Sequence, residues 1–468
     1  MAKKLWGGRF KEKTDPEFFE FQKSIKDDYK LATYDILHSL IHITALEKSG
    51  ILSKTEKSKL EFALLRVKKK ISEEINNKQF KPKDSEDIHT EIQNRVEKEL
   101  GRKYGALVLK LHTLRSRNDQ ISFDLRCYCA QKSLNIYFYL LHLVKGLLEL
   151  CIEAAKKKQE FIGYTHTRRA QVIPFAYYLD AYKDMFERDL NRTKKYHDEI
   201  FIYIGAGALA GSSLSSSAYN AGIKEQIREI MLGVLEQPQI YEKIRLSGNP
   251  LDNVSDRDFI IQFLSILSIL QMHFSRLAED LILYSTKEFD LIALPEEFCT
   301  GSSLMPHKKN PDLLELIRGN TGKIYGNLVS ILTTMKSLPL TYDRDMQLDK
   351  EPLFSSVETV EAELRILAKF IKKVKLRTET VDAIKKQDIS LYATEIAEEL
   401  VRKNGVPFKK AHDIVGRFIT LLEKNGGNLD NIKDLKHKCS GINKKMIEKI
   451  MKPGYVVSLR KSFSRKIK

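Results

Sequence analysis

The sequence predicts an all-α protein with a central bundle of long helices. Proline is absent from three long stretches, residues 83–173, 175–237 and 251–294, and apolar residues recur throughout them. Because proline interrupts helices, such stretches indicate long helices. Signals for β-strands are sparse. We therefore expect helices packed against one another, with smaller helical regions before and after the bundle.

The segment 259–283 predicts the clearest helix. Apolar residues occupy almost its whole circumference, which is typical of a helix inside a bundle. Charged residues at its start and in its second half argue against a membrane span. Its few polar residues form one narrow stripe, which consists of Gln262, Ser265, Ser268 and Gln271.

Three further long helices are expected, at 125–155, 167–190 and 313–336. We place three domains around them: an N-terminal helical domain at 1–110, the central helical bundle at 111–368 and a C-terminal helical domain at 369–468. Turn signals divide the C-terminal domain into short helices. They contain Gly405, Gly426 and Gly454.

The composition is that of a soluble globular protein, with 42% hydrophobic and 30% charged residues among 468. No apolar run reaches the ~18 residues that a membrane helix needs. The N-terminus lacks the apolar core of a secretory signal, so we favour the cytoplasm. The five cysteines are an odd number without zinc-type spacing. Free thiols are expected, with Cys127 and Cys129 as packing residues.

The net charge of +17 raises the question of a nucleic-acid partner. The lysines are dispersed along polar helix faces, and the basic C-terminal tail, RKSFSRKIK, is short. We therefore expect no nucleic acid as a partner, and a small acidic substrate instead.

A glycine-rich match at 199–210, EIFIYIGAGALA, looks like a strand followed by the G-x-G-x-x-A pattern of dinucleotide-binding folds. That pattern needs a helix directly after the glycines and a second strand that completes a βαβ unit. The next residues do not begin an amphipathic helix, and no second strand is apparent. We expect a turn between helices rather than a nucleotide site.

The segment 301–312, GSSLMPHKKNPD, is the most informative part of the chain. Asn310 is a good helix N-cap, Pro311 suits the first helical position, and Asp312 favours the positive end of the helix dipole. A serine loop, a lysine pair and a helix N-terminus at one point suit a substrate with carboxylates and a reaction that develops negative charge. Taken alone, the segment could also be a surface loop before a capped helix.

Three other polar segments carry chemistry. LHTLRSRNDQ (111–120) contains two arginines, whose forked donors suit carboxylates, or else begins a salt-bridged helix. GYTHTRRAQ (163–171) offers a histidine before a helix, which is the natural acid or base near neutral pH, or else a surface residue. YDRDMQLDKEPLF (342–354) is densely charged, as solvated helix faces usually are. In SEDIHTEI (85–92), Ser85 is expected to cap a helix, and a structural role is favoured for His89.

Together these segments resemble the fumarase/aspartase superfamily of lyases, and within it the argininosuccinate lyase family. Matching segments run from WGGRF near residue 6 to residue 354, about three quarters of the chain. The resemblance implies the all-α, long-helix fold of that superfamily. The segments at 111–120 and 342–354 favour argininosuccinate lyases over other members.

The resemblance also implies roles for individual residues. The catalytic set is Ser302 as the base, His166 assisting proton transfer, Lys308 stabilising charge, and Glu315 paired with His166. Substrate-binding roles are implied for Ser24, Ser116, Arg117, Asn118, Thr165, Asn310, Tyr342, Gln347 and Lys350.

The implied reaction is the reversible anti-elimination of argininosuccinate to arginine and fumarate, a step in arginine biosynthesis. It needs neither a cofactor nor a metal, and the sequence shows no metal-ligand spacing. In this superfamily three subunits contribute to each site. The resemblance therefore implies a homotetramer built around the central bundle, with active sites shared between subunits.

The chain departs from the family pattern in three places. Leu114 stands where the family usually has glycine, Thr167 and Arg168 replace leucine and glutamine, and Phe463-Ser464 replaces a glycine pair. Two alternatives follow. One is a catalytically silent paralogue with a structural or binding role. The other is a different fumarate-releasing lyase of the superfamily, acting on adenylosuccinate, aspartate or malate.

Overall fold

The computed structural model describes residues 14–81, 85–231, 238–432 and 439–459, with Glu12 and Leu435. The segment WGGRF and the C-terminal tail with Phe463-Ser464 lie outside them. The chain forms two compact units. Unit 1 comprises residues 1–137, 191–269 and 322–361, and unit 2 comprises 138–190, 270–321 and 362–468. The three predicted domain boundaries remain a prediction.

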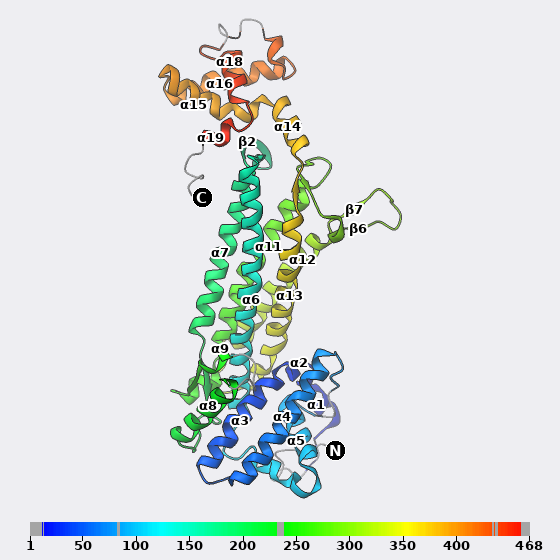
Figure 1. The fold of residues 1–468 in the computed structure, drawn as a ribbon, viewed down its shortest axis with the longest axis vertical. Helices are drawn as coiled ribbons and strands as arrows, with labels where there is room; N and C mark the ends of the chain where they lie inside the picture. The colour runs from blue at the N-terminus through cyan, green and yellow to red at the C-terminus, as the bar shows by residue number, and fades with distance from the viewer. Residues whose placement is uncertain are drawn as a thin grey trace. The chain divides into compact units, whose positions relative to one another are not determined.

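The predicted all-α class is confirmed. The five longest helices of the bundle run alongside one another (Figure 1). Three of them contain or almost coincide with helices that the sequence predicted, at 125–155, 259–283 and 313–336. They are α6 (Arg117–Lys156), α7 (Phe175–Glu199), α11 (Asp258–Tyr284), α12 (Asp312–Met335) and α13 (Lys350–Phe370).

Within unit 1, specific contacts join these helices in pairs. Tyr128 on α6 packs edge-on against Phe354 on α13, and the Lys132 ammonium lies 2.9 Å from the Glu361 carboxylate on the same helix pair. The rings of Tyr196 on α7 and Phe263 on α11 stack with centroids 4.9 Å apart. Burial of such large rings is the main driving force for helix packing.

Within unit 2, the same helices pack through a second set of contacts. Phe186 on α7 meets Phe274 on α11, and the buried Gln271 amide donates to the Ile317 carbonyl of α12 at 3.0 Å. Gln271 belongs to the polar stripe predicted on 259–283. The Gln271 side chain therefore has a hydrogen-bond partner on the neighbouring helix, which a buried polar group needs.

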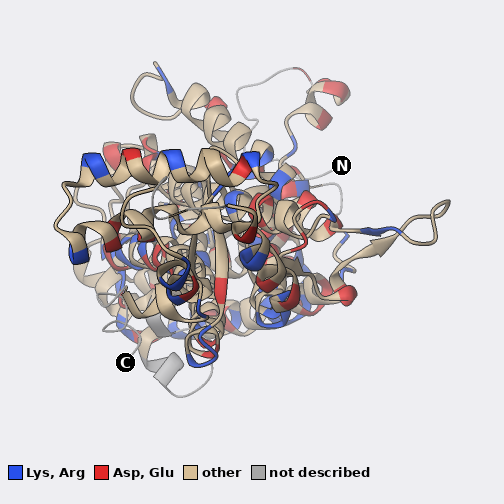
Figure 2. Ribbon diagram, turned by 90° about the horizontal axis from the view of Figure 1, so that it is seen from above, with Lys and Arg blue, Asp and Glu red and all other residues tan. Residues whose placement is uncertain are grey.

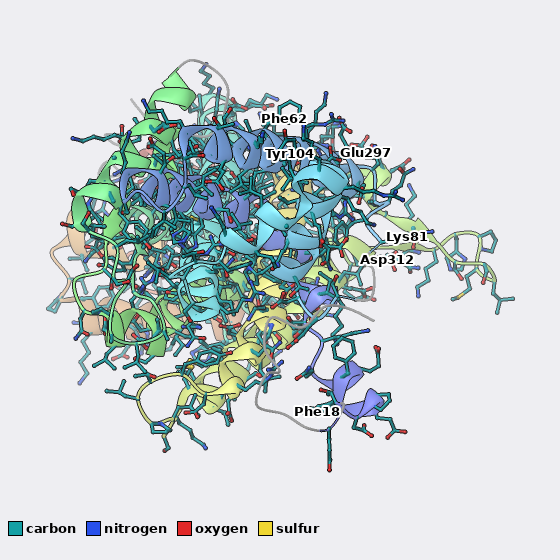
Figure 3. All side chains as sticks on the ribbon, turned by 90° about the horizontal axis from the view of Figure 1, so that it is seen from below. Phe18, Phe62, Lys81, Tyr104, Glu297 and Asp312 are labelled. Carbon is teal, nitrogen blue, oxygen red and sulfur yellow. The ribbon has the colours of Figure 1, made fainter. Side chains whose placement is uncertain are left out.

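The N-terminal part of unit 1 is helical up to Tyr104, as expected. Ser85 does not cap α5, however. The carboxylate of Asp87 accepts from the Thr90 amide at 2.7 Å and is the N-cap, while the buried Ser85 hydroxyl donates to Glu91. Phe18 on α1 and Phe62 on α4 remain exposed (Figure 3). The helices are α1 (Pro16–Phe21), α2 (Ile25–Asp28), α3 (Ala32–Lys48), α4 (Lys54–Asn76) and α5 (Ile88–Tyr104).

The remaining helices are shorter, and the predicted turns separate those near the C-terminus. Gly405 ends α15 with a left-handed φ of 64°, and Gly426 follows α16 with a φ of 71°. Glycine suits both positions, since other residues are strained there. The helices are α8 (Ser216–Met231), α9 (Pro238–Tyr241), α10 (Pro250–Ser255), α14 (Thr378–Gln387), α15 (Ala393–Asn404), α16 (Phe408–Lys424), α18 (Lys444–Ile450) and α19 (Tyr455–Leu459).

Strands in the described residues form four two-stranded pairs. The predicted helix at 167–190 is wrong in its first turns: β1 and β2 form an antiparallel hairpin there, and α7 begins only after Pro174. The pairs are β1 (Glu160–Thr165) with β2 (Arg168–Pro174), β3 (Ile202–Ile204) with β4 (Ile244–Leu246), β5 (Ile292–Ala293) with β8 (Lys375–Leu376), and β6 (Thr300–Gly301) with β7 (Lys309–Asn310).

The glycine-rich match at 199–210 has more strand context than expected. β3 pairs in parallel with β4, and α8 lies between them in the sequence, so the expectation that no second strand follows is wrong. The sheet stops at two strands. The amides of Gly205 and Ala206 donate to the Asp119 carboxylate, both at 3.1 Å, so a protein side chain occupies the place a phosphate would take.

Two expectations about composition can be compared with the structure. Cys127 and Cys129 are free and buried, as expected for packing residues. Basic and acidic residues are interspersed along the ribbon (Figure 2).

Among the described helices, α11 alone is long and apolar enough to cross a membrane, and most of its apolar window is buried inside the protein. Such a helix is typical of a bundle core.

Candidate active site

Unit 1 brings segments distant in the sequence to one arginine. Arg117 begins α6, and its Nε lies 3.1 Å from Asp87 Oδ2 at the N-terminus of α5. Its two terminal nitrogens donate to the Gln120 side chain at 2.9 Å and to the Thr90 hydroxyl at 3.3 Å. A guanidinium held on three sides has one preferred orientation, which is what a carboxylate-binding arginine requires.

Behind Arg117 lies a buried polar network. The Gln120 amide donates to Asp35 at 2.6 Å, and His89 Nδ1 lies 3.0 Å from the same Asp35 oxygen. Burial opposes ionisation of Asp35, but His89 and the nearby arginines outweigh it and hold its pKa well below the usual value. Asp124 lies 3.7 Å from His89, and burial followed by the charge of Asp35 raises its pKa well above the usual value.

Asp35, His89 and Asp124 are the group in the described residues that could hold a metal by composition, since their ligand atoms lie within 4.8 Å of one another. His89 Nδ1 lies 3.0 Å from the Asp35 carboxylate, and Arg115 and Arg117 already supply positive charge to Asp35. Charge balance therefore does not require a cation here. His89 lies in this network behind Arg117, and the structural role favoured for it from the sequence stays a prediction.

The turn before α6 is held by the glycine-rich loop. Leu114 has a left-handed φ of 59°, and its carbonyl accepts from the Ser212 hydroxyl at 3.3 Å. Ser116 accepts from the Asn118 amide at 3.2 Å, and the Asn118 side chain donates to the Ala208 carbonyl at 3.4 Å. Ser116, Arg117 and Asn118 therefore lie on one rigid turn. Burial raises the pKa of Asp119, which anchors the loop, to about 6.

Ser24 lies in the same unit. Its buried hydroxyl donates to Asp28 at 2.6 Å, and the other Asp28 oxygen accepts from the Ile88 amide at 3.1 Å. Burial, assisted by the charge of Asp87, raises the pKa of Asp28 to about 6. Gln347 donates to the Gln22 carbonyl at 3.3 Å, which ties the 342–354 segment to the N-terminal one.

Lys350, at the start of α13, is buried rather than solvated. Its ammonium lies 2.9 Å from Asp349 Oδ1, and Arg257 donates to Asp349 Oδ2 at 2.7 Å. The general expectation that so charged a segment is a solvated face therefore fails at Asp349 and Lys350, whereas Arg344, Asp345 and Glu351 are exposed. Tyr342 is half-buried. Unit 1 thus gathers seven predicted binding residues, which are Ser24, Ser116, Arg117, Asn118, Tyr342, Gln347 and Lys350.

Unit 2 presents the other predicted residues on two hairpins and, for Glu315, on the first turn of α12. Thr165 and His166 lie at the tip of the β1–β2 hairpin and are exposed. His166 and Thr167 both have left-handed φ values, 52° and 57°. Two such residues in succession form the tight turn that matches the twist of a hairpin, which asparagine and glycine adopt with less strain. Thr167 therefore adopts a conformation that β-branched residues rarely take.

The serine loop is the tip of the β6–β7 hairpin and extends away from the helices (Figure 1). The Ser302 hydroxyl accepts from the amides of Leu304 and Met305, at 3.3 and 3.1 Å, which leaves its proton free to donate. Lys308 is exposed in the same loop. The loop thus places a hydroxyl and an ammonium on one short turn.

The start of α12 differs from the prediction. Asn310 belongs to β7, where it pairs with Thr300, and is not the N-cap. The Pro311 carbonyl accepts the first helical hydrogen bonds, from Leu314 and Glu315, so the helix begins one residue later than expected. Asp312 lies in the first turn at the base of the hairpin (Figure 3) and pairs with the Thr300 hydroxyl. The hairpin is thereby tied to the helix.

Unit 2 does not pair His166 with Glu315 within one chain. Both side chains are exposed, and no ion pair joins them among the described residues.

Sequence reasoning also missed the residues that support the site in unit 1. Asp349 had a signal in the sequence, because it directly precedes the predicted Lys350. The missed residues are Asp28, Asp35, Asp87, Gln120, Arg257 and Asp349.

Known proteins share this fold. An EDDS lyase in complex with formate superposes with a TM-score of 0.73 at 21% identity, over 96% of this chain and 86% of that one. A class II fumarase from Schistosoma mansoni gives 0.68 at 16%, over 89% and 92%. A family model described as lyase matches residues 8–326. The long-helix fold and the serine loop thus define a lyase of the fumarase/aspartase superfamily.

The position within that superfamily follows from nearer relatives. The argininosuccinate lyase of Caldanaerobacter subterraneus subsp. tengcongensis is 42% identical over 424 residues, 90% of each chain. That of Bacillus anthracis is 43% identical over 426 residues, 90% of this chain and 86% of the relative. Residues 390–458 match the argininosuccinate lyase C-terminal model. The chain belongs to the argininosuccinate lyase family.

Proposed function

We propose that this chain is an argininosuccinate lyase that reversibly cleaves argininosuccinate to arginine and fumarate, in arginine biosynthesis. The observation that carries the proposal is the arrangement around Arg117. A guanidinium fixed by Asp87, Gln120 and Thr90 lies on a turn with two further polar side chains, Ser116 and Asn118. This arrangement suits a substrate that carries several carboxylates.

The reaction begins with removal of a proton from the carbon next to a succinyl carboxylate. We assign this step to Ser302, whose hydroxyl accepts two backbone hydrogen bonds and whose oxygen these donors stabilise as an anion. The electron pair then resides on a doubly negative carboxylate. Lys308, in the same loop, is assigned to its stabilisation, together with Asn310 at the end of the hairpin.

The second step breaks the carbon–nitrogen bond and releases fumarate. The electron pair of the carboxylate forms the new double bond, and the departing guanidino nitrogen takes a proton. His166 is assigned as the acid, with Thr165 beside it as a substrate contact and Glu315 as its carboxylate partner. Tyr342, Gln347, Lys350 and Ser24 are assigned to the arginine part of the substrate. No step requires a cofactor or a metal.

The assigned residues are complete only in an assembly of several chains. Thr165, His166 and Lys308 are exposed on hairpin tips, so the described residues do not enclose these three side chains. The outer face of α12 is also exposed and apolar, with Leu316, Val329 and Leu332 uncovered. Exposed apolar faces of this kind are covered by partner subunits. We therefore infer a homotetramer in the cytoplasm, with sites shared between subunits.

Fumarate release tests the proposed reaction. Purified protein would be supplied in parallel with argininosuccinate, adenylosuccinate, aspartate and malate, and fumarate followed by its ultraviolet absorbance. The expected result is release from argininosuccinate alone. Release from another substrate would assign a different reaction within the superfamily. No release by a folded assembly would favour the silent paralogue, and the Thr167-Arg168 pair would be the first to revert.

A further inference from the structure

A basic pocket in unit 2 is separate from every residue assigned to the reaction. Its volume is about 410 Å³, and it lies between α6 and the end of α13. Small-molecule sites commonly measure about 300 to 1,000 Å³, so the space admits a metabolite-sized ligand. Its lining consists of Tyr139, His142 and Lys145 from α6, Leu364, Arg365, Ala368 and Lys369 from α13, and Lys372 from the 3-10 helix Ile371–Lys373 that follows α13.

Four cationic side chains line this pocket, and among the described residues Lys372 is the one that has a carboxylate partner. Lys372 lies 3.1 Å from Glu149. In the part of the chain that the structure describes, no carboxylate lies within ion-pair distance of Lys145, Arg365 or Lys369. Like charges gathered on one surface repel one another. A bound anion would relieve that repulsion.

The backbone of α6 comes close to the 3-10 helix after α13 at this pocket. A side chain at Gly146 would come within 3.1 Å of Ile371 and 3.3 Å of Lys372, so glycine permits the contact. Glycine inside a helix costs about 1 kcal/mol relative to alanine. That cost is offset here by a close approach that places Lys372 beside the α6 residues of the pocket.

The pocket also has an apolar part. Leu364 is buried, Ala368 and Tyr139 are half-buried, and the Arg365 guanidinium lies over the Tyr139 ring at 5.5 Å from its centroid. Arginine forks match phosphate oxygens in geometry and charge, and lysines add point charges around them. An aromatic ring and aliphatic side chains can meanwhile contact the organic part of a ligand.

We propose that this pocket binds a small anion that carries two or more phosphate groups. The proposal does not depend on the lyase reaction, because the pocket shares no residue with the assigned site. Two sources supply this chemistry, nucleotides and inorganic polyphosphate. Both present several negative charges within a few ångströms, and four cationic side chains line this one pocket.

Calorimetric titration of the assembled full-length protein tests the proposal. Tripolyphosphate, adenosine triphosphate and adenosine would be the probes, at about 50 mM salt, because phosphate binding weakens steeply as salt rises. Both phosphate probes are expected to bind, and adenosine is not. Tighter binding of adenosine triphosphate would identify nucleotides as the source, and equal binding would identify the polyphosphate group alone. Absence of binding by both phosphate probes would overturn the proposal.

Matched variants separate the pocket from the general basic charge of the chain. Arg365→Gln with Lys369→Gln should weaken binding at least about tenfold, since both removed groups would contact phosphate. Ala368→Trp fills the pocket without removing charge and should weaken binding similarly. Lys386→Gln with Lys410→Gln removes the same charge from exposed positions of unit 2 outside the pocket and should change the Kd less than about twofold.

Two results would contradict the assignment of the pocket. Equal losses in the pocket and control variants would show non-specific attraction to a basic protein. Dissociation of the assembly by the pocket variants, measured by light scattering, would show that these cations face a second copy of the chain instead.

Discussion

Lys350 and Asp349 form a buried ion pair, with 2.9 Å between the ammonium and the carboxylate, directly before the first turn of α13. Arg257 donates to the other oxygen of the same carboxylate, so one acid pairs with two buried cations. Lys350 is therefore fixed before any substrate arrives. A cation held in this way needs less reordering when it binds a carboxylate.

Asp349→Asn should lower the free energy of unfolding by about 3 kcal/mol or more, because two buried cations lose their counter-charge. Urea unfolding at pH 7 measures the change. Glu351→Gln, two residues along and exposed, is the control and should change stability by less than about 0.5 kcal/mol. Similar, small changes in both variants would show that Asp349 does not hold the pair together.

Ser302→Ala should abolish turnover while leaving the assembly intact, because the loop loses its base but no buried contact. Initial rates of fumarate formation and light scattering check the two parts of this prediction. Ser303→Ala removes the neighbouring hydroxyl and should leave most of the activity. If the Ser302 variant keeps its activity, serine is not the base.

Lys308→Met should also abolish turnover, since no cation in the loop would then stabilise the doubly negative carboxylate. Lys309→Met is the matched control, because Lys309 already pairs with Glu296. Steady-state rates of the two variants measure the effect. Equal losses would indicate a general need for positive charge in the hairpin rather than a specific role of Lys308.

Leu114→Gly should raise the free energy of unfolding by about 0.5 to 1 kcal/mol. Leu114 has a φ of 59° and is 47% exposed, so glycine relieves backbone strain and loses little buried area. Thermal or urea unfolding measures the change. Leu109→Gly alters an exposed leucine without a left-handed φ and should instead lower stability. A loss of stability in both variants would contradict strain at Leu114.

Asp28 predicts a dependence of stability on pH. Its pKa is raised to about 6 in the folded protein, so between roughly pH 4 and 6 the folded chain binds more protons than the unfolded chain. Stability therefore falls as pH rises through this window. Asp28→Asn should remove about 3 kcal/mol of that decline, since two pKa units correspond to that energy.

Asparagine can keep both hydrogen bonds of Asp28. Its oxygen accepts from the Ile88 amide, and its amide donates to the Ser24 hydroxyl in place of the present bond. The measurement is the urea midpoint from pH 4 to pH 7 for the wild type, the variant and the control Asp27→Asn. Parallel pH profiles for all three proteins would rule out Asp28 as the source of the decline.

The sequence was sufficient for the helical frame but not for the turns that present the site. The apolar periodicity of 259–283 and 313–336 located α11 and α12 to within a residue or two. The hairpin at 160–174 was missed because its turn, His166-Thr167, lacks the asparagine or glycine that usually signals such a turn. The signal available for strands was the alternation of apolar and polar residues around Phe161 in β1 and around Val172 in β2.

The polar network in unit 1 was also beyond prediction from the sequence. Arg117, Asp87 and Asp35 lie far apart along the chain, and no local pattern relates them. Asn310 was misassigned because pairing with Thr300 across the hairpin outweighed its tendency to cap a helix. In both cases contacts distant in the sequence determined what a local rule could not.

Mixing of two inactive variants tests most directly whether this chain is a lyase with sites shared between subunits. Arg117→Met alters unit 1 and Ser302→Ala alters unit 2, and each alone should be inactive. Refolded together in equal amounts, they should regain about a quarter of the wild-type rate of fumarate release from argininosuccinate, because about one site in four draws both segments from unaltered copies. No recovery in a mixed tetramer would contradict the shared site.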